Sequence, residues 1–460
     1  MPSKTSGTSC FSAFVSLFGG GPKISTPSKD AFYWDRPANF DTLHNGAILR
    51  SRPVDLVYFP GFQDPPLQAW QVAYKTKAQD GMTPQVTVTT IIRPSTARKD
   101  SDGAWHLLSY QSKCDSASPN CRTSYALRAG NDYKLGALSE QVFMEPCLDR
   151  GWIVLVPDYE SETDAFGAGP QSAYATLDGI RAALAFADLG IADADGKVNA
   201  KVTLWGYSGG ALATGWAAQK QPSYAPELPV VGASIGGVPA DLNAIAVRVN
   251  KTIAAGLYIG VMAGLSNAYP ELASWLDSNA TPAGKKAFAA AKSTSFGVVM
   301  KDNINLDVVG TCFNASLVDP LGQKIPAQII EENKVGLDGA APTMPMQVYH
   351  SIHDEVVPVK TVDDLVDTWA KSGSTIEYVR DTLSEHVVLS FTGCAAAIDW
   401  IQTRFDGEPP LARPGKPRIT TVFTSLESDD AKITLGAGRQ SELNDLLETK
   451  YKQPNRKWWT

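Results

Sequence analysis

The strongest constraint on the fold of this chain is an alternation of short apolar runs with segments of helical spacing. The runs at 106–109, 152–156 and 202–205 are typical of buried strands, and the segments 175–186 and 211–220 are typical of packed helices. The pattern resumes with strands at 346–349 and 376–379 and helices at 361–371 and 388–404. Such alternation predicts an α/β fold with a mostly parallel, doubly wound sheet.

Two segments stand apart from this alternation. A hairpin is predicted for 71–75 and 85–92, which flank a turn at Gln79-Asp-Gly81. From about Pro239 to Pro342 the pattern is mostly helical, and a block of roughly 100 residues is too long for a connecting loop, which indicates an inserted cap. We therefore expect an N-terminal extension (1–60), a first part of the α/β core (61–238), a helical cap (239–342), a second part of the core (343–406) and a C-terminal surface flap (407–460).

The composition excludes several classes of protein. With 43% hydrophobic and 19% charged residues, the chain is ordinary for a soluble globular protein. A formal net charge of -7 does not suggest a surface for nucleic acid, and no apolar run is long enough to cross a bilayer. The six cysteines match no zinc-binding spacing. We expect no metal, no cofactor and no nucleic-acid partner.

The N-terminus bears on the location of the protein. Lys4, the apolar stretch 10–18 and the glycines 19–21 have the outline of a signal peptide, although serines interrupt the short apolar region. Sequons for N-glycosylation begin at Asn250, Asn279 and Asn314. We expect a secreted protein, and a cytoplasmic location is the alternative.

Two stretches match the Gly-x-Ser-x-Gly pattern of a nucleophile elbow, one around Ser208 and one around Ser234. The elbow is a tight turn between a strand and a helix, with glycines where the backbones pass closely. Ser208 follows the strand at 202–205 and precedes the helix at 211–220. Ser234 is followed by a Gly-Gly-Val-Pro sequence that cannot begin a helix at once. We therefore predict Ser208 as the nucleophile and Ser234 as a packing residue of a strand.

The partners of Ser208 follow from the chain order serine, acid, histidine. His386 lies between the strand at 376–379 and the last helix, at a strand end where open α/β sheets bind ligands, and is the predicted base. Asp354 follows the strand at 346–349 and is the predicted acid, with Glu355 and Asp381 as rivals. The sequence His350-x-x-His353-Asp354 lacks the H-E-x-x-H arrangement of a zinc site.

An oxyanion hole needs two donors aimed at the carbonyl oxygen of the substrate. The main-chain N–H of Gly209 is the first predicted donor. The second comes from the loop after the strand at 106–109, which runs from Tyr110 to Ala117 and lacks the HGGG pattern of many esterases. The residues alone leave its identity open.

With these motifs the chain resembles the fungal secretory lipases over most of residues 60–405. The matching segments are 109–111, 121–127, 177–181, 206–211, 223–228, 231–234, 353–358 and 385–386. The resemblance implies an α/β-hydrolase fold, the triad of Ser208, Asp354 and His386, a helical cap and a C-terminal flap. It also implies Asp115 as the second oxyanion donor, with Ser112 and Ser116 as alternatives, and a disulfide between Cys121 and Cys312, while Cys394 has no clear partner.

The predicted function is hydrolysis of acyl esters through an acyl-enzyme. The protein is expected to be a lipase or esterase whose substrate is a lipid ester or a small-molecule ester. A lipase would act at a lipid–water interface. One alternative uses the same triad to deacetylate or transacylate a fungal secondary metabolite. Another is a catalytically dead α/β-hydrolase that serves as a binding module. The apolar segment 253–265 has two interpretations. It is either buried core of the cap, or its glycines, Gly256 and Gly264, leave a groove for the acyl chain.

Overall fold

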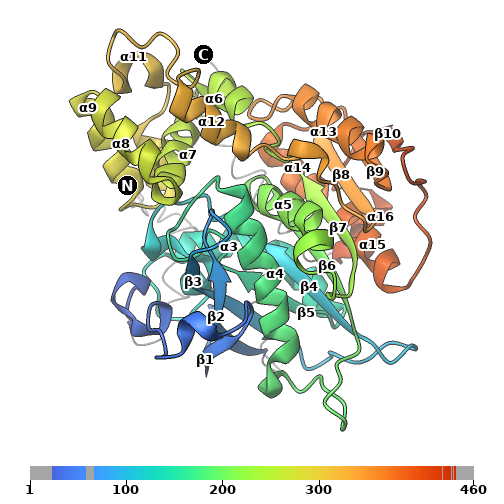
Figure 1. The fold of residues 1–460 in the computed structure, drawn as a ribbon. Coiled ribbons are helices and arrows are strands. Elements are labelled where there is room, and N and C mark those ends of the chain that lie inside the picture. Colours follow the sequence, from blue (N-terminus) through green and yellow to red (C-terminus); the bar gives the residue numbers. More distant parts are fainter. Residues whose placement is uncertain (1–22, 58–66, 427, 437, 439, 442–460) are drawn as a thin grey trace, which may run out of the picture.

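The computed structural model describes residues 23–57, 67–426, 428–436, 438 and 440–441. Its centre is a ten-stranded sheet in the order β1-β2-β3-β5-β4-β6-β7-β8-β9-β10 (Figure 1). The strands are β1 (Ile48–Pro53), β2 (Gln68–Lys77), β3 (Pro84–Arg93), β4 (Trp105–Gln111), β5 (Ile153–Pro157), β6 (Ala200–Tyr207), β7 (Val230–Gly236), β8 (Met346–Ser351), β9 (Ile376–Asp381) and β10 (Arg418–Val422). Along the sheet from β5 through β4 and β6 to β10, all neighbouring strands pair in parallel. The neighbours in the order β1-β2-β3-β5 pair antiparallel. The mostly parallel α/β sheet predicted from the sequence is confirmed, and so is the hairpin, as β2 and β3.

Alternate residues of the central strands enter two separate cores, as the two-residue period of a strand requires. Leu107, Val202 and Leu204 belong to the core that contains residues of α4 and α5, whereas Leu108 and Trp205 belong to the core of α3 and α15. All five side chains are buried. Both faces of the sheet are therefore covered by helices, which explains why its strands appear in the sequence as continuous apolar runs.

The helices outside the insertion are α2 (Thr123–Ala126), α3 (Lys134–Asp149), α4 (Gly169–Ala185), α5 (Gly209–Tyr224), α13 (Val359–Lys371), α14 (His386–Thr392), α15 (Cys394–Phe405) and α16 (Asp429–Leu435). Short 3-10 turns occur at Pro27–Lys29, Ala31–Tyr33, Phe40–Thr42, Pro119–Cys121, Ala187–Leu189 and Leu337–Gly339. The single helix predicted for 388–404 is two helices, since Gly393 separates α14 from α15. Among the described residues no helix is both long and apolar enough to cross a membrane.

Between β7 and β8 the chain forms helices only. They are α6 (Leu242–Val249), α7 (Ala255–Ala268), α8 (Pro270–Asn279), α9 (Pro282–Ala291), α10 (Phe296–Asp302), α11 (Val308–Cys312) and α12 (Lys324–Glu332), and they gather at one end of the molecule (Figure 1). We call α6–α12 the helical insertion. The fully buried Asn333 joins it to the core. Its side chain accepts from the N–H of Gly169, at 2.8 Å, and donates to the Tyr269 hydroxyl, also at 2.8 Å.

Two of the glycines of α7, Gly256 and Gly264, are packed against backbone and do not line a groove. A Cβ added to Gly264 would lie 2.4 Å from the main-chain oxygen of Phe166, and one added to Gly256 would lie 2.8 Å from the Cα of Met300 in α10. Distances below 3.0 Å leave no space for a side chain. The interpretation of these glycines as the wall of an acyl groove is therefore wrong, and they allow close helix packing.

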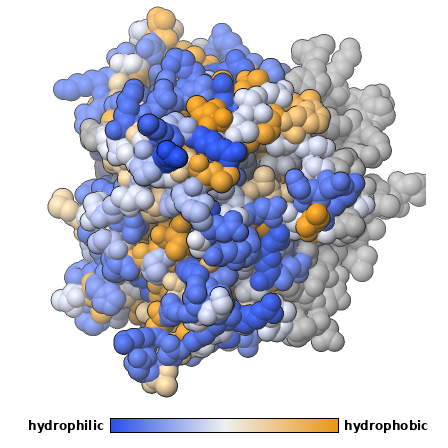
Figure 2. Space-filling view, turned by 90° about the vertical axis from the view of Figure 1, so that its right-hand side faces the viewer, coloured by the Kyte–Doolittle hydropathy of each residue, from blue (hydrophilic) through white to orange (hydrophobic). Residues whose placement is uncertain are grey.

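Two further expectations are corrected by the structure. The predicted disulfide is not formed, because Cys121 and Cys312 are both free thiols, and the Cys121 sulfur lies 3.8 Å from the main-chain oxygen of Thr294. The segment 407–460 is not wholly a separate flap, since β10 extends the main sheet beside β9. On the side of the molecule that carries this edge, hydrophobic residues occur in small groups among hydrophilic ones (Figure 2), as is usual for protein surfaces. The signal-like segment and Cys10 lie outside the described residues.

Candidate active site

Ser208 lies at the tight turn between β6 and α5. Its backbone has φ 52° and ψ -123°, a strained conformation for a residue with a side chain. The flanking glycines make the turn sterically feasible. A Cβ on Gly206 would lie 2.3 Å from the main-chain oxygen of Gly210, and a Cβ on Gly210 would lie 1.9 Å from that of Gln111. The turn therefore has the geometry of a nucleophile elbow.

The structure brings the three predicted catalytic side chains into one hydrogen-bonded chain. The Nε2 atom of His386 lies 2.9 Å from the Oγ of Ser208, and its Nδ1 lies 2.7 Å from the Oδ2 of Asp354. Oδ1 of Asp354 accepts from the N–H groups of Val356, at 2.9 Å, and Val357, at 2.6 Å. The carboxylate is thus fixed by its own loop and directed at the histidine.

Burial and charge act in opposite directions on this pair. Burial lowers the pKa of His386, but the charge and hydrogen bond of Asp354 raise it by more, so that the net pKa is raised. Burial likewise raises the pKa of Asp354, and the interactions with His386 overcome it and lower that pKa. A base with a raised pKa beside an ionised acid suits the transfer of a proton from a serine hydroxyl.

Two alternatives weighed for the triad, Ser234 and Asp381, have other partners. The Ser234 hydroxyl is buried within β7 and donates to Oε1 of Gln347, at 2.8 Å. The Asp381 carboxylate accepts from the N–H groups of Leu383 and Ser384 and from Thr424. None of these contacts involves His386. Among the described residues, no group of three or more His, Cys, Asp and Glu side chains could hold a metal ion.

Asp115 lies against the start of α5, where its Oδ1 would be 1.8 Å from a Cβ added to Gly209. The side chain is buried, and its Oδ1 has no hydrogen-bond partner. Burial raises the pKa of Asp115 to about 7, and Glu140 adds to this effect, whereas Lys113 and His386 oppose it. A neutral carboxylic acid can donate a hydrogen bond, which an ionised one cannot.

The two serines weighed against Asp115 are engaged elsewhere. The Ser112 hydroxyl lies 2.6 Å from that of Thr123. The Ser116 hydroxyl accepts from the N–H of Ser118, at 3.3 Å. Of the three candidates, Asp115 is the one whose polar group lies beside Gly209 without a partner of its own.

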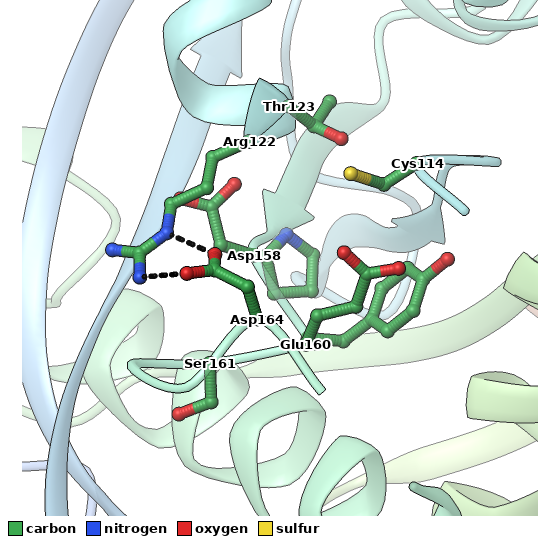
Figure 3. Close-up of a pocket in the computed structure, with 9 residues that line it drawn as sticks. Cys114, Arg122, Thr123, Asp158, Glu160, Ser161 and Asp164 are labelled. Carbon is green, nitrogen blue, oxygen red and sulfur yellow. Dashed lines mark hydrogen bonds and ion pairs between the residues drawn. The ribbon is translucent and has the colours of Figure 1, made fainter. Parts of the chain in front are cut away.

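A cluster of buried polar side chains lies beside the loop that carries Asp115 (Figure 3). Arg122 forms two hydrogen bonds to the Asp164 carboxylate, at 2.7 and 3.1 Å, while Cys114 and Glu160 lie on the other side of the small pocket. Glu160 accepts from the N–H of Ser116, at 3.2 Å. Burial raises the pKa of Glu160 well above the usual range of a glutamate. No motif in the sequence marks this residue, which follows the end of β5.

Comparisons with known proteins show which family the chain is similar to. The model of the secretory lipase family matches residues 135–413. Lipase A of Arthroderma benhamiae is 34% identical over 87% of this chain and 83% of its own length. A Mycobacterium tuberculosis protein named as a probable inactive lipase is 35% identical over 87% of each chain. The secreted triacylglycerol lipase LIP3 of Malassezia restricta is 31% identical over 84% of this chain and 81% of its own length.

Solved structures give the same result. Candida antarctica lipase A in its closed state superimposes with a TM-score of 0.80 and 27% identity, over 92% of this chain and 96% of the lipase. A rice cell wall degrading esterase of Xanthomonas oryzae shares the fold, with a TM-score of 0.62 and 16% identity over 80% of this chain and all of the esterase. The predicted resemblance is confirmed, and the chain belongs to the secretory lipase family of carboxylic-ester hydrolases with an α/β-hydrolase fold.

Proposed function

We propose that this enzyme cleaves acyl esters through an acyl-enzyme formed on Ser208. The observation that carries the proposal is the continuous hydrogen-bonded chain from Asp354 through His386 to Ser208. The Ser208 oxygen bonds to the acyl carbon while its proton moves to Nε2 of His386, which then gives the proton to the leaving alcohol. Water repeats the sequence, with His386 as base, and releases the acid and the free serine. Asp354 holds the imidazole in the required tautomer.

The negative charge that develops on the carbonyl oxygen requires two donors. We assign these roles to the N–H of Gly209, at the positive end of α5, and to the neutral carboxyl of Asp115. The raised pKa of Asp115 supports this role, because an aspartate of ordinary pKa would be ionised at neutral pH and would repel the oxyanion.

We infer that the helical insertion contributes to substrate selection. Phe166 connects the two parts of the site, since its ring lies 3.5 Å from the Cβ position of Gly209 and 3.5 Å from that of Gly260 in α7. An acyl chain that reaches Ser208 would have to pass near this ring. The relatives named as lipases support a lipid ester as the substrate, and the one named as a secreted lipase supports a secreted enzyme. Action at a lipid–water interface belongs to the same proposal.

The name of the mycobacterial relative favours one competing candidate, a fold of this family without activity. Labelling with a fluorophosphonate and hydrolysis of p-nitrophenyl esters from acetyl to palmitoyl separate the two. We expect the wild-type protein to be labelled at Ser208. Ser208→Ala should abolish labelling and lower kcat by about 10⁴–10⁶-fold, while the matched change Ser234→Ala should retain both. Retained turnover in Ser208→Ala would refute the proposal.

A further inference from the structure

The residues that adjoin two members of the proposed triad contact the main chain of the third. Tyr207 precedes Ser208, and its hydroxyl donates to the main-chain oxygen of His386, at 2.5 Å. Glu355 follows Asp354, and its Oε2 accepts from the main-chain N–H of His386, at 2.8 Å. Both polar groups of the backbone at His386 are therefore held by side chains from the loops that carry the nucleophile and the acid.

These two hydrogen bonds, which come from outside α14, hold the main chain of His386 and thereby position its imidazole. His386 is the first residue of α14, where an N–H has no acceptor within the helix. The preceding residue, Glu385, provides no side-chain cap, so Glu355 satisfies this N–H instead. Tyr207 is 5% exposed, and the centroid of its ring lies 5.4 Å from that of the imidazole.

The carboxylate of Glu355 places a negative charge beside the base, because its Oε2 lies 2.8 Å from the main-chain nitrogen of His386. Burial, and then Glu385, raise the pKa of Glu355, although its bond to the N–H of His386 acts against this.

The other charged or titratable groups near the imidazole come from several elements. They are Asp354 and His350 from β8 and its loop, Lys113 and Asp115 from the loop after β4, and Tyr207 from β6. On the side of the helical insertion, Nε of Arg248 donates to the main-chain oxygen of Glu355, at 3.3 Å. Lys113 lowers the pKa of His386, whereas Glu355 raises it.

We propose that Glu355 is a positioning residue for the base and acts in two ways. Its side chain, together with that of Tyr207, fixes the main chain of His386 at the distance from Ser208 that proton transfer needs. The negative charge of its carboxylate, beside the main chain of His386, stabilises the imidazolium that forms during the reaction. This inference rests on the proposed function, because it requires His386 to be the base.

Three variants separate the two effects. Glu355→Ala removes an anchor, Tyr207→Phe removes the other anchor without a change of charge, and the double variant Glu355→Gln with Glu385→Gln removes the charge but keeps an acceptor for the N–H. The exposed Glu271→Gln in α8 is the matched control.

We expect the first two variants to lose about ten- to a hundredfold in kcat at constant KM, since small misplacements of a catalytic group are costly. The double variant should move the acid limb of the kcat/KM profile about 0.5–1 pH unit lower, and Tyr207→Phe should leave the limb in place.

The outcomes are distinguishable from a failure of the proposed function. If Ser208→Ala remains active, the function itself is wrong. The positioning role alone is wrong if Ser208→Ala is inactive and the other variants behave like the wild type. In that case Glu355→Ala and Tyr207→Phe have the wild-type kcat, and the double variant has the wild-type acid limb. Thermal melts followed by circular dichroism show whether each variant folds. If Glu355→Ala does not fold, Tyr207→Phe and the double variant decide the question.

Discussion

Asp115 predicts an unusual dependence of activity on pH. If its neutral carboxyl donates to the oxyanion, only the enzyme with protonated Asp115 is fully active. For a pKa of about 7, about nine in ten molecules are protonated at pH 6 and about one in ten at pH 8. The ionised form lacks a donor worth about 10²–10³ in rate and places a negative charge near the oxyanion. Because the raised pKa of His386 also reduces kcat/KM at low pH, the effect of Asp115 is seen in a ratio. We expect the kcat/KM of the wild type, divided by that of a variant whose donor does not titrate, to fall by about tenfold from pH 6 to pH 8.

The variant that tests this reasoning is Asp115→Asn, whose amide donates a hydrogen bond and does not titrate. Its kcat/KM should follow the titration of His386 alone, so that the ratio of wild type to variant falls between pH 6 and pH 8, whereas Asp115→Ala should be about 10²–10³-fold less active than the wild type at pH 6. Initial rates on a soluble p-nitrophenyl ester, read at the isosbestic wavelength of the phenol and phenolate, give the profile without correction for product ionisation. A ratio of wild-type to Asp115→Asn kcat/KM that stays constant over this range would refute the role of Asp115.

Three further predictions follow from contacts described above. Asp354→Asn should lower kcat by about 10⁴-fold in ester hydrolysis, and Asp381→Asn should lower it far less; the reverse order would mean that the acid is wrongly assigned. Asn333→Ala should reduce the free energy of unfolding in urea by about 2–4 kcal/mol, because several buried partners lose their hydrogen bonds, and an unchanged midpoint would argue against this junction. Gly264→Leu should lower the melting temperature through a clash with Phe166, with no selective loss on long acyl esters; a stable variant that discriminates by chain length would restore the acyl groove.

Much of this fold is predictable because its strands are buried on both faces. Apolar runs such as 202–205 and 346–349 mark the central strands, and the chain order of serine, acid and histidine then selects His386 and Asp354 from few alternatives. β10 was not foreseen. It is an exposed edge strand, with Ile419 54% exposed, and such a strand lacks the apolar run of a central one.

The other misses depend on contacts between distant segments. The small residues of α7 are compatible both with close helix packing and with a groove. Only the position of the Phe166 backbone, which leaves no space at Gly264, decides between the two. The role of Glu355 also escaped prediction. As a neighbour of Asp354 it was weighed only as a rival acid, and nothing in the spacing of Glu355 and His386 predicts that the carboxylate accepts from the main-chain N–H of the histidine.

The link between Asp381 and Thr424 has a consequence for synthesis of the enzyme. One oxygen of Asp381 accepts from the N–H of Ser384, two residues before His386, and the other accepts from the N–H of Thr424 beyond β10. The loop that carries the base therefore takes its full set of bonds only after residue 424 has left the ribosome, when most of the sheet has already had time to form. A nascent chain that is released early, before Thr424, would retain the central strands and lack this support. We therefore expect chains that end before Thr424 to hydrolyse esters more slowly than the whole chain.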